Sequence, residues 1–218
     1  MKIYDISQEV FTCNVFPGDP QPERIEMMKI KDGEMCNLTA LKMCAHNGTH
    51  VDAPYHFIDG GRTIDMVDMR RFVGLAYVAS HEGDLKAEDA RRILDEARKA
   101  EDTAGKTISV SDISFGSSKD SDEDHAYYRI LVKGNATVTE EAAKVFAEAG
   151  ILLFGNESQT VGPEDAPKAV HLIMLGAQIV LLEGIRLSEV EDGIYLLNAA
   201  PINLGGADGA PCRAILMA

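Results

Sequence analysis

Short apolar and alternating apolar–polar runs dominate the first half of the chain and predict β-strands. The strands expected there cover residues 2–6, 23–31, 36–45 and 75–79. The second and third of these runs flank Lys31-Asp32-Gly33-Glu34, whose Asp-Gly pair is typical of a hairpin turn. The first half is therefore expected to be rich in strands.

The second half alternates between helical and strand patterns. Ala90, Ile93, Leu94 and Ala97 recur at helical spacing and predict a helix over residues 87–100. Two more helices are expected, one from Thr139 to Glu148 with Gly150 ending it and one over residues 163–178. The strands expected in this half cover residues 107–110, 128–132, 151–154, 179–182, 194–197 and 213–217, and residues 111–125 are expected to form an exposed loop. This alternation predicts parallel pairing in an α/β fold with a mixed sheet, formed by one domain over residues 1–218.

Composition narrows the class of protein. The 218 residues are 45% hydrophobic, which is ordinary for a globular domain, and the net charge of −14 disfavours binding to nucleic acid. No apolar run is long enough to span a membrane, and the first residues do not resemble a secretion signal. The four cysteines form no close pair, so we read them as reduced and mostly buried. These features favour a cytoplasmic protein without a membrane partner.

One stretch, residues 45–57, concentrates the residues suited to chemistry. It contains three of the six histidines, and His46, His50 and Asp52 offer the imidazole and carboxylate ligands that zinc and manganese accept. So few protein ligands would leave room for water, and His56 lies close enough in sequence to move a proton near it. The sequence therefore predicts a divalent metal site.

The spacing of this stretch predicts its shape. On one straight strand, His46 and His50 would lie roughly 13 Å apart, too far to share an ion. A regular helix would bring them together, but Gly48 weakens a helix and Pro54 breaks its interior. We therefore expect a strand ending near His46, a sharp bend at Asn47-Gly48, and a loop or short helical turn carrying the rest.

A second group of candidate residues lies far along the chain. His171 falls within the helix expected over residues 163–178, and Glu183 directly follows the apolar strand 179–182. A charge at the end of a buried strand is costly unless a positive group meets it, and such strand ends often carry sites. From the residues alone, His171 is equally well explained as a core histidine and Glu183 as a partner of Arg186.

The first stretch resembles a known family. Residues 46–57 match the pattern His-x-Gly-Thr-His-x-Asp-x-Pro-x-His-Phe of the cyclase-like metal-dependent hydrolases, which include bacterial kynurenine formamidase and isatin hydrolase. Residues 170–175 and 182–185 resemble the family's histidine-containing helix and glutamate-ending strand, and residues 16–20, 155–160 and 207–214 resemble other segments of it. The resemblance spans most of the chain and is weakest over residues 81–127.

The resemblance implies a swivelling β/β/α fold and a site for one or two divalent ions, zinc first and manganese as the alternative. It implies that Asp52 bridges two ions and that His56 is the general acid/base. The metal ligands that it implies are His46, His50, Asp52, His171 and Glu183. It also implies homodimers or homotetramers in which neighbouring subunits shape the pocket.

The implied activity is hydrolysis of an amide, with N-formylkynurenine as the first substrate and kynurenine and formate as products. Opening of a cyclic amide or lactone such as isatin is the alternative, and the absence of tryptophan leaves the substrate open, because aromatic side chains usually line the formamidase pocket. A different class is a metal-stabilised binding protein without turnover. A third reading, a cysteine hydrolase that uses Cys44 beside His46, lacks an activating feature for the thiol.

Overall fold

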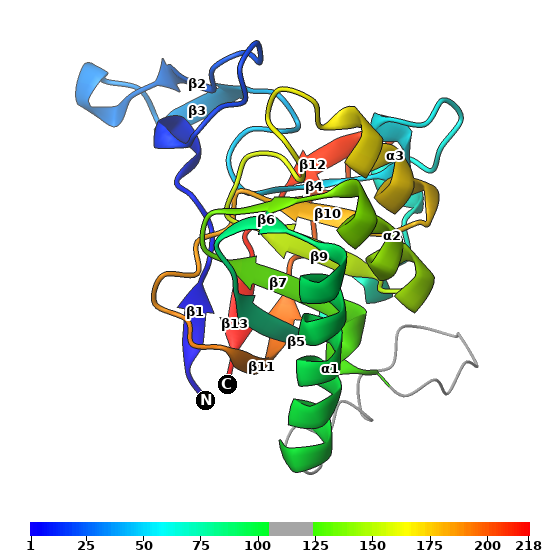
Figure 1. The fold of residues 1–218 in the computed structure, drawn as a ribbon. Helices are drawn as coiled ribbons and strands as arrows, with labels where there is room; N and C mark the ends of the chain where they lie inside the picture. Colours follow the sequence, from blue (N-terminus) through cyan, green and yellow to red (C-terminus); the bar gives the residue numbers. More distant parts are fainter. Residues whose placement is uncertain (105–123) are drawn as a thin grey trace.

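The structure, a computed structural model, describes residues 1–104 and 124–218 and is built on a curled mixed β-sheet of nine strands (Figure 1). In spatial order the strands are β1 (Ile3–Asp5), β13 (Ile215–Met217), β11 (Gly193–Asn198), β5 (Val73–Ser80), β7 (Arg129–Lys133), β9 (Leu153–Asn156), β10 (Val180–Glu183), β4 (His50–Asp52) and β12 (Gly209–Pro211). Strands β5, β7, β9 and β10 pair in parallel, and the pairs outside them are antiparallel. The predicted α/β class with a mixed sheet is confirmed.

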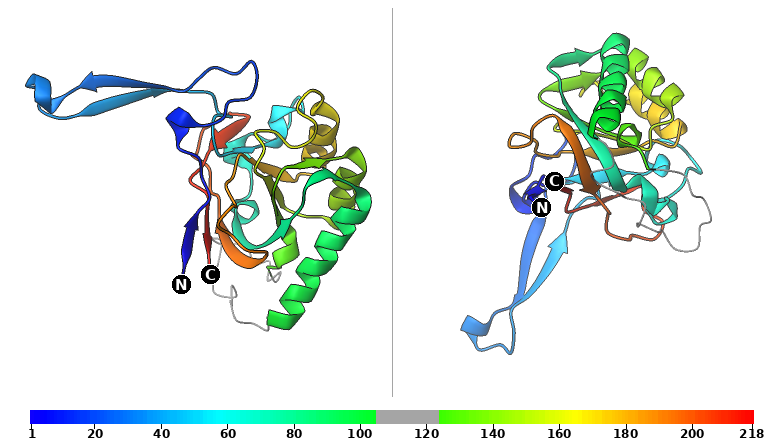
Figure 2. Two further views of the ribbon diagram at one scale, coloured as in Figure 1. Left: turned by 60° about the vertical axis from the view of Figure 1, so that its left-hand side comes forward. Right: turned by 90° about the horizontal axis from the view of Figure 1, so that it is seen from below.

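Three α-helices pack together on one face of the sheet (Figures 1 and 2). They are α1 (Ala87–Ala104), α2 (Glu140–Ala149) and α3 (Lys168–Gly176). Helix α2 has the predicted ends, because the Thr139 side chain accepts a hydrogen bond from the Ala142 N–H and Gly150 adopts the left-handed conformation with φ 68°. Helix α3 starts later than the expected residue 163, directly after Pro167, which lacks the N–H that a longer helix needs.

Apolar side chains form two core clusters, which together cover both faces of the sheet. One lies between the sheet and the helices and includes Ile130, Phe146 and Phe154, and the other includes Val51 and Leu182. A separate parallel pair, β6 (Gly83–Leu85) with β8 (Ala136–Val138), was not expected from the sequence. The strand expected over 107–110 and most of the loop expected over 111–125 lie outside the described residues.

A β-hairpin projects away from the rest of the molecule (Figure 2). It consists of β2 (Glu23–Met28) and β3 (Leu38–Lys42), as the sequence predicted, and it turns through a 3₁₀ helix and Gly33, whose φ is 92°. The pairs Ile25–Ala40 and Met28–Leu38 lie opposite one another, so one face of the hairpin is apolar. Ile25 is 41% exposed and Leu38 is 48% exposed, so this apolar face is largely uncovered.

Short 3₁₀ helices connect several of these elements. They cover Val10–Thr12, Ile30–Asp32, Pro54–His56, Ile64–Met66, Met69–Arg71 and Ala126–Tyr128. The four cysteines are unpaired and half-buried, less buried than expected. Among the described residues, no helix combines the length and apolar character needed to cross a membrane.

Candidate metal centre

Strand β4 carries two of the candidate ligands and lies between β10 and β12. His50 pairs with Glu183 of β10, and Asp52 pairs with Gly209 of β12. Alternation along β4 places His50 and Asp52 on one face, where directly paired Glu183 joins them. All three side chains are buried, so two strands distant in sequence fix a compact cluster.

The sequence-based expectation for this stretch was partly wrong. Residues 50–52 form a sheet strand rather than a loop or helical turn, because β10 and β12 provide backbone partners on both sides. The helical turn starts only at Pro54, in the 3₁₀ helix that carries His56. The expected bend is present at Gly48, whose φ is 69°.

His46 lies in the turn before β4 and not at the end of a strand, because β3 stops at Lys42. The bend at Gly48 folds the imidazole back, so that His46 Nδ1 lies 2.8 Å from Asp52 Oδ1. Its ring packs against Gly209, where an added Cβ would lie 2.8 Å from His46 Cε1. A side chain at position 209 would therefore displace this histidine.

The second group of candidate residues, His171 and Glu183, lies in contact with Asp52 of the first. His171 on α3 places Nε2 3.2 Å from Glu183 Oε1 and 3.6 Å from Asp52 Oδ2. Glu183 Oε1 also accepts a hydrogen bond from the Val161 N–H at 2.7 Å. The Arg186 guanidinium donates instead to the main-chain carbonyls of Glu157, Gly184 and Ile185. The geometry thus favours the grouping with Asp52 over a pairing with Arg186.

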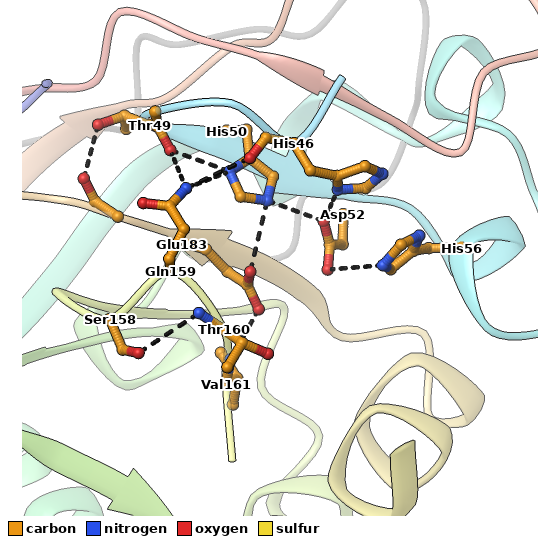
Figure 3. A network of polar contacts seen from close by, with 12 residues as sticks. His46, Thr49, His50, Asp52, His56, Ser158, Gln159, Thr160, Val161 and Glu183 are labelled. Atoms are coloured by element: carbon orange, nitrogen blue, oxygen red, sulfur yellow. Dashed lines mark hydrogen bonds and ion pairs between the residues drawn. The ribbon is translucent and has the colours of Figure 1, made fainter. Parts of the chain in front are cut away.

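Two buried polar atoms in this cluster have no hydrogen-bond partner: His50 Nε2 and Asp52 Oδ2. His50 Nε2 lies 3.3 Å from Asp52 Oδ1 and 3.4 Å from Glu183 Oε2 (Figure 3). Among the described residues, two sets have ligand atoms close enough to hold an ion, and Asp52 belongs to both. They are His46, Asp52 and His56, and His50, Asp52 and Glu183. Buried unsatisfied imidazole and carboxylate atoms that converge are well suited to a divalent cation.

The outward ring nitrogens support the same interpretation. His50 Nδ1 lies 3.0 Å from the Gly48 carbonyl oxygen, and His171 Nδ1 lies 2.9 Å from that of Pro167. If each Nδ1–H donates to its carbonyl, each Nε2 lone pair faces the centre, as is usual for metal-binding histidines. Gln159 donates to the Gly48 carbonyl at 2.6 Å, a contact that the sequence did not reveal.

Without a cation, the cluster pairs protonated imidazoles with ionised carboxylates. Burial lowers the pKa of the histidines, but their interactions with the neighbouring carboxylates outweigh it and raise the pKa of His46, His50 and His171 to about 10. Burial raises the pKa of Asp52, and its imidazole partners bring that pKa well below the usual range. Protons thus neutralise the metal-free centre, and a cation would have to replace them.

His56 lies at the exposed side of the cluster. Its Nε2 is 3.9 Å from Asp52 Oδ2, and its ring stacks on His46 with centroids 4.0 Å apart. Its side chain is 27% exposed, so solvent reaches it. Its other nitrogen, Nδ1, lies 3.1 Å from Asp208 Oδ2. Asp208 was not among the candidate site residues named from the sequence. Asp208 is 152 positions away, in the segment 207–214 that resembles the family but to which the sequence assigned no role.

Cys44 has no comparable setting. Its Sγ lies 3.8 Å from Asp19 Oδ2 and accepts from the His46 N–H, whereas the His46 imidazole is directed to Asp52 and Asp208. The geometry therefore offers this thiol no imidazole base from His46.

A hollow of about 350 Å³ lies beside the cluster. Gln159 lines it and also contacts Gly48 next to the centre. Phe16 and Pro17 of the N-terminal loop also line the hollow. Most of the other lining residues are polar, and Glu157 and Glu164 are acidic.

Comparison with known proteins places this chain in a family. The family model described as "Putative cyclase" matches residues 4–163. A kynurenine formamidase of Salinibacter ruber is 32% identical over 230 residues, covering 99% of this chain and 97% of that protein. One of Bacillus thuringiensis (strain Al Hakam) is 29% identical, covering 97% and 95%. Isatin hydrolase A from Labrenzia aggregata shares the fold, with a TM-score of 0.72, 19% identity and coverage of 99% and 93%. The chain therefore belongs to the cyclase family, as the motif over residues 46–57 had indicated.

Proposed function

We propose that this protein is a metal-dependent amide hydrolase that converts N-formylkynurenine and water to kynurenine and formate. Relatives named kynurenine formamidase match the chain over nearly its whole length. The observation that carries the proposal is the pair of buried, unsatisfied atoms, His50 Nε2 and Asp52 Oδ2, within a cluster of imidazoles and carboxylates. Residues 1–218 would act as one catalytic domain.

The proposed metal ligands come from two distant parts of the chain. They are His46, His50, Asp52, His171 and Glu183. Asp52 belongs to both candidate sets, which supports one or two ions with Asp52 shared between them. His56, which completes the first set, is assigned proton transfer and not metal binding. Zinc is the first candidate and manganese the second, because both accept imidazole and carboxylate ligands. When bound, the cation supplies Lewis acidity that makes water a nucleophile near neutral pH and polarises the amide carbonyl.

His56 is the proposed proton carrier. Its Nε2 faces the centre while Nδ1 lies against Asp208, so a neutral imidazole can accept the proton of the attacking water at Nε2. The same nitrogen then returns the proton to the amide nitrogen as the C–N bond breaks. The water oxygen stays on the formyl carbon, which leaves as formic acid and ionises to formate and a solvent proton, and the aromatic amine leaves as kynurenine.

The hollow beside Gln159 is proposed to receive the aromatic part of the substrate. Phe16 lines it, and aromatic rings pack favourably against one another. This chain has no tryptophan, so Phe16 would supply the aromatic surface.

The deciding experiment starts from protein stripped of metal and reloaded with zinc or manganese. We expect metal-dependent release of kynurenine and formate from N-formylkynurenine, followed by kynurenine absorbance, and none from stripped protein. Isatin and a lactone are assayed in parallel, because faster opening of either would identify the cyclic substrate class instead. Stoichiometric metal binding without turnover of any substrate would support the binding protein and contradict the hydrolase.

We further propose that the protein works in the cytoplasm as a homodimer or homotetramer. The four unpaired cysteines support a reducing compartment. The uncovered apolar face of the β2–β3 hairpin supports association with a second copy, because isolated two-stranded hairpins are marginally stable. Light scattering coupled to gel filtration tests the association, and a monomer at micromolar concentration would contradict it.

A further inference from the structure

We propose that Asp208 is a positioning residue whose single oxygen, Oδ2, orients both the metal-facing His46 and the proton carrier His56. This inference rests on the proposed roles of these histidines. Oδ2 lies 2.9 Å from His46 Nε2 and 3.1 Å from His56 Nδ1. The two rings that it contacts are stacked, with centroids 4.0 Å apart. One carboxylate oxygen thus contacts two adjacent imidazoles that serve different proposed tasks.

The main chain around Asp208 is fixed to the motif strand. The Asp208 carbonyl oxygen accepts a hydrogen bond from the Ala53 N–H at 2.9 Å, and the next residue, Gly209, pairs with Asp52 across β12 and β4. The preceding residue, Ala207, accepts a hydrogen bond from the Ile64 N–H at 2.9 Å. The sheet therefore fixes the backbone position of Asp208. This limits how far its carboxylate can move away from the two imidazole rings.

The two hydrogen bonds select the ring nitrogens that face the centre. A carboxylate oxygen accepts, so His46 presents its proton on Nε2 and His56 presents its proton on Nδ1. His46 Nδ1 lies 2.8 Å from Asp52 Oδ1 and therefore also carries a proton while no cation is bound, whereas His56 Nε2 lies 3.9 Å from Asp52 Oδ2. By holding the Nε2 proton of His46, Asp208 leaves Nδ1 as the nitrogen at which a cation would replace a proton. By holding the Nδ1 proton of His56, it leaves Nε2 to accept a proton at the centre.

Asp208 is accessible enough to test without dismantling the core. Its side chain is 41% exposed, whereas Asp52 is 1% exposed. Replacing Asp208 leaves an opening at the surface and not a buried cavity, so Asp208→Ala should remain folded. Asp208→Asn keeps the size of the side chain while removing its charge and one acceptor oxygen, and it serves as the milder variant.

The experiment uses zinc-loaded protein and three readouts. For Asp208→Ala we expect zinc affinity, measured by chelator competition, and kcat each to fall about 10–100-fold, as is typical when the partner of a metal-binding histidine is removed. KM should change little, because Asp208 does not line the hollow beside Gln159. Ring ¹⁵N spectra of histidine-labelled protein should show the tautomers of His46 and His56 becoming mixed. Added acetate should restore part of the lost kcat in this variant alone.

The matched control is Asp65→Ala. Asp65 Oδ1 accepts a hydrogen bond from the Gly206 N–H at 2.9 Å, so it holds the same loop without contacting either imidazole. We expect zinc affinity and kcat within about twofold of the wild type, since exposed contacts of this kind contribute little. Equal losses in Asp65→Ala and Asp208→Ala would reduce Asp208 to a loop contact and overturn the inference.

Other outcomes separate this inference from the proposed function. Unchanged zinc affinity, ring spectra and kcat in both Asp208→Ala and Asp208→Asn would overturn the role of Asp208 while leaving the hydrolase intact. Wild-type protein that binds zinc without deformylating N-formylkynurenine would contradict the proposed substrate instead. In that case, the affinity and spectra would still decide whether Asp208 orients the histidines.

Discussion

Strand β4 and the β2–β3 hairpin are neighbours in sequence, but their pairing partners come from different parts of the chain. β4 has three residues, all buried, and takes its pairing partners from residues 181–183 and 209–211. The hairpin strands pair with each other, and nearly all of their residues are exposed. The comparison shows that long-range pairing fixes the proposed catalytic centre, whereas local pairing forms a projecting arm.

The two regions also differ in the kind of group that has no partner. The centre has unsatisfied buried polar atoms, which a cation would satisfy, and the hairpin has an uncovered apolar face, which another surface would cover. Changes at the centre should therefore act on metal binding and turnover. Changes at the hairpin should act on association, and the following predictions test this separation.

The largest effect is expected from Asp52→Asn. The change removes the carboxylate that both candidate ligand sets share and leaves buried imidazoles without their counter-charge. Because a metal ion contributes several kcal/mol to catalysis, we expect kcat/KM to fall at least about 10³-fold, together with lost metal content. Elemental analysis and turnover measure both effects. Full metal content with full activity would remove Asp52 from the centre.

His56→Ala should separate proton transfer from metal binding. Loss of a positioned acid/base typically lowers kcat by about 10²–10⁴-fold, and His56 is not among the five proposed metal ligands. We expect the metal content to stay at the wild-type level, measured by elemental analysis alongside steady-state kinetics. A variant with unchanged kcat would show that another group carries the proton.

The hairpin should respond differently on its two faces. Leu38→Glu puts a charge on the apolar face, and burial of a leucine side chain is worth about 1.5–3 kcal/mol, so association should weaken about 10–150-fold. Leu41→Glu makes the same change on the opposite face, where Arg24 is its cross-strand partner, and should leave association unchanged. Sedimentation at several concentrations measures both. Equal behaviour of the two variants would reject the apolar face as the contact.

The smallest effect concerns the pH dependence of stability in the metal-free protein. The pKa of His46, His50 and His171 is raised to about 10, so their protonation stabilises the fold below about pH 6.5 and that contribution is lost as the pH rises toward 10. The melting temperature of stripped protein should therefore fall by several degrees between pH 6.5 and 10. Zinc-loaded protein should lose less, because the cation has replaced these protons. Identical pH profiles would contradict this exchange.

The sequence predicted the parts of the fold that local signals define. The Asp-Gly pair at 32–33 marks the hairpin, and Thr139 and Gly150 mark the ends of α2. The motif over residues 46–57 identified its candidate residues because they are close in sequence. His171 and Glu183 required the family resemblance, since nothing local connects them to that motif.

Other features depend on contacts that no local pattern encodes. The three residues of β4 read as a bend or turn, since only partners more than 100 positions away make them a strand. The three-residue strand β12 went unpredicted for the same reason. Asp208 received no role, because its significance comes entirely from where β12 places it.

The pairing of β4 with β12 also bears on the order of events during synthesis. Residues 46–56 leave the ribosome early, but β12, the strand that pairs with β4 on one side, ends only at Pro211. A nascent chain thus carries three of the five proposed metal ligands long before they can be held in place. Chains that stop before β12 would lack a pairing partner of β4 and would be left with an incomplete centre.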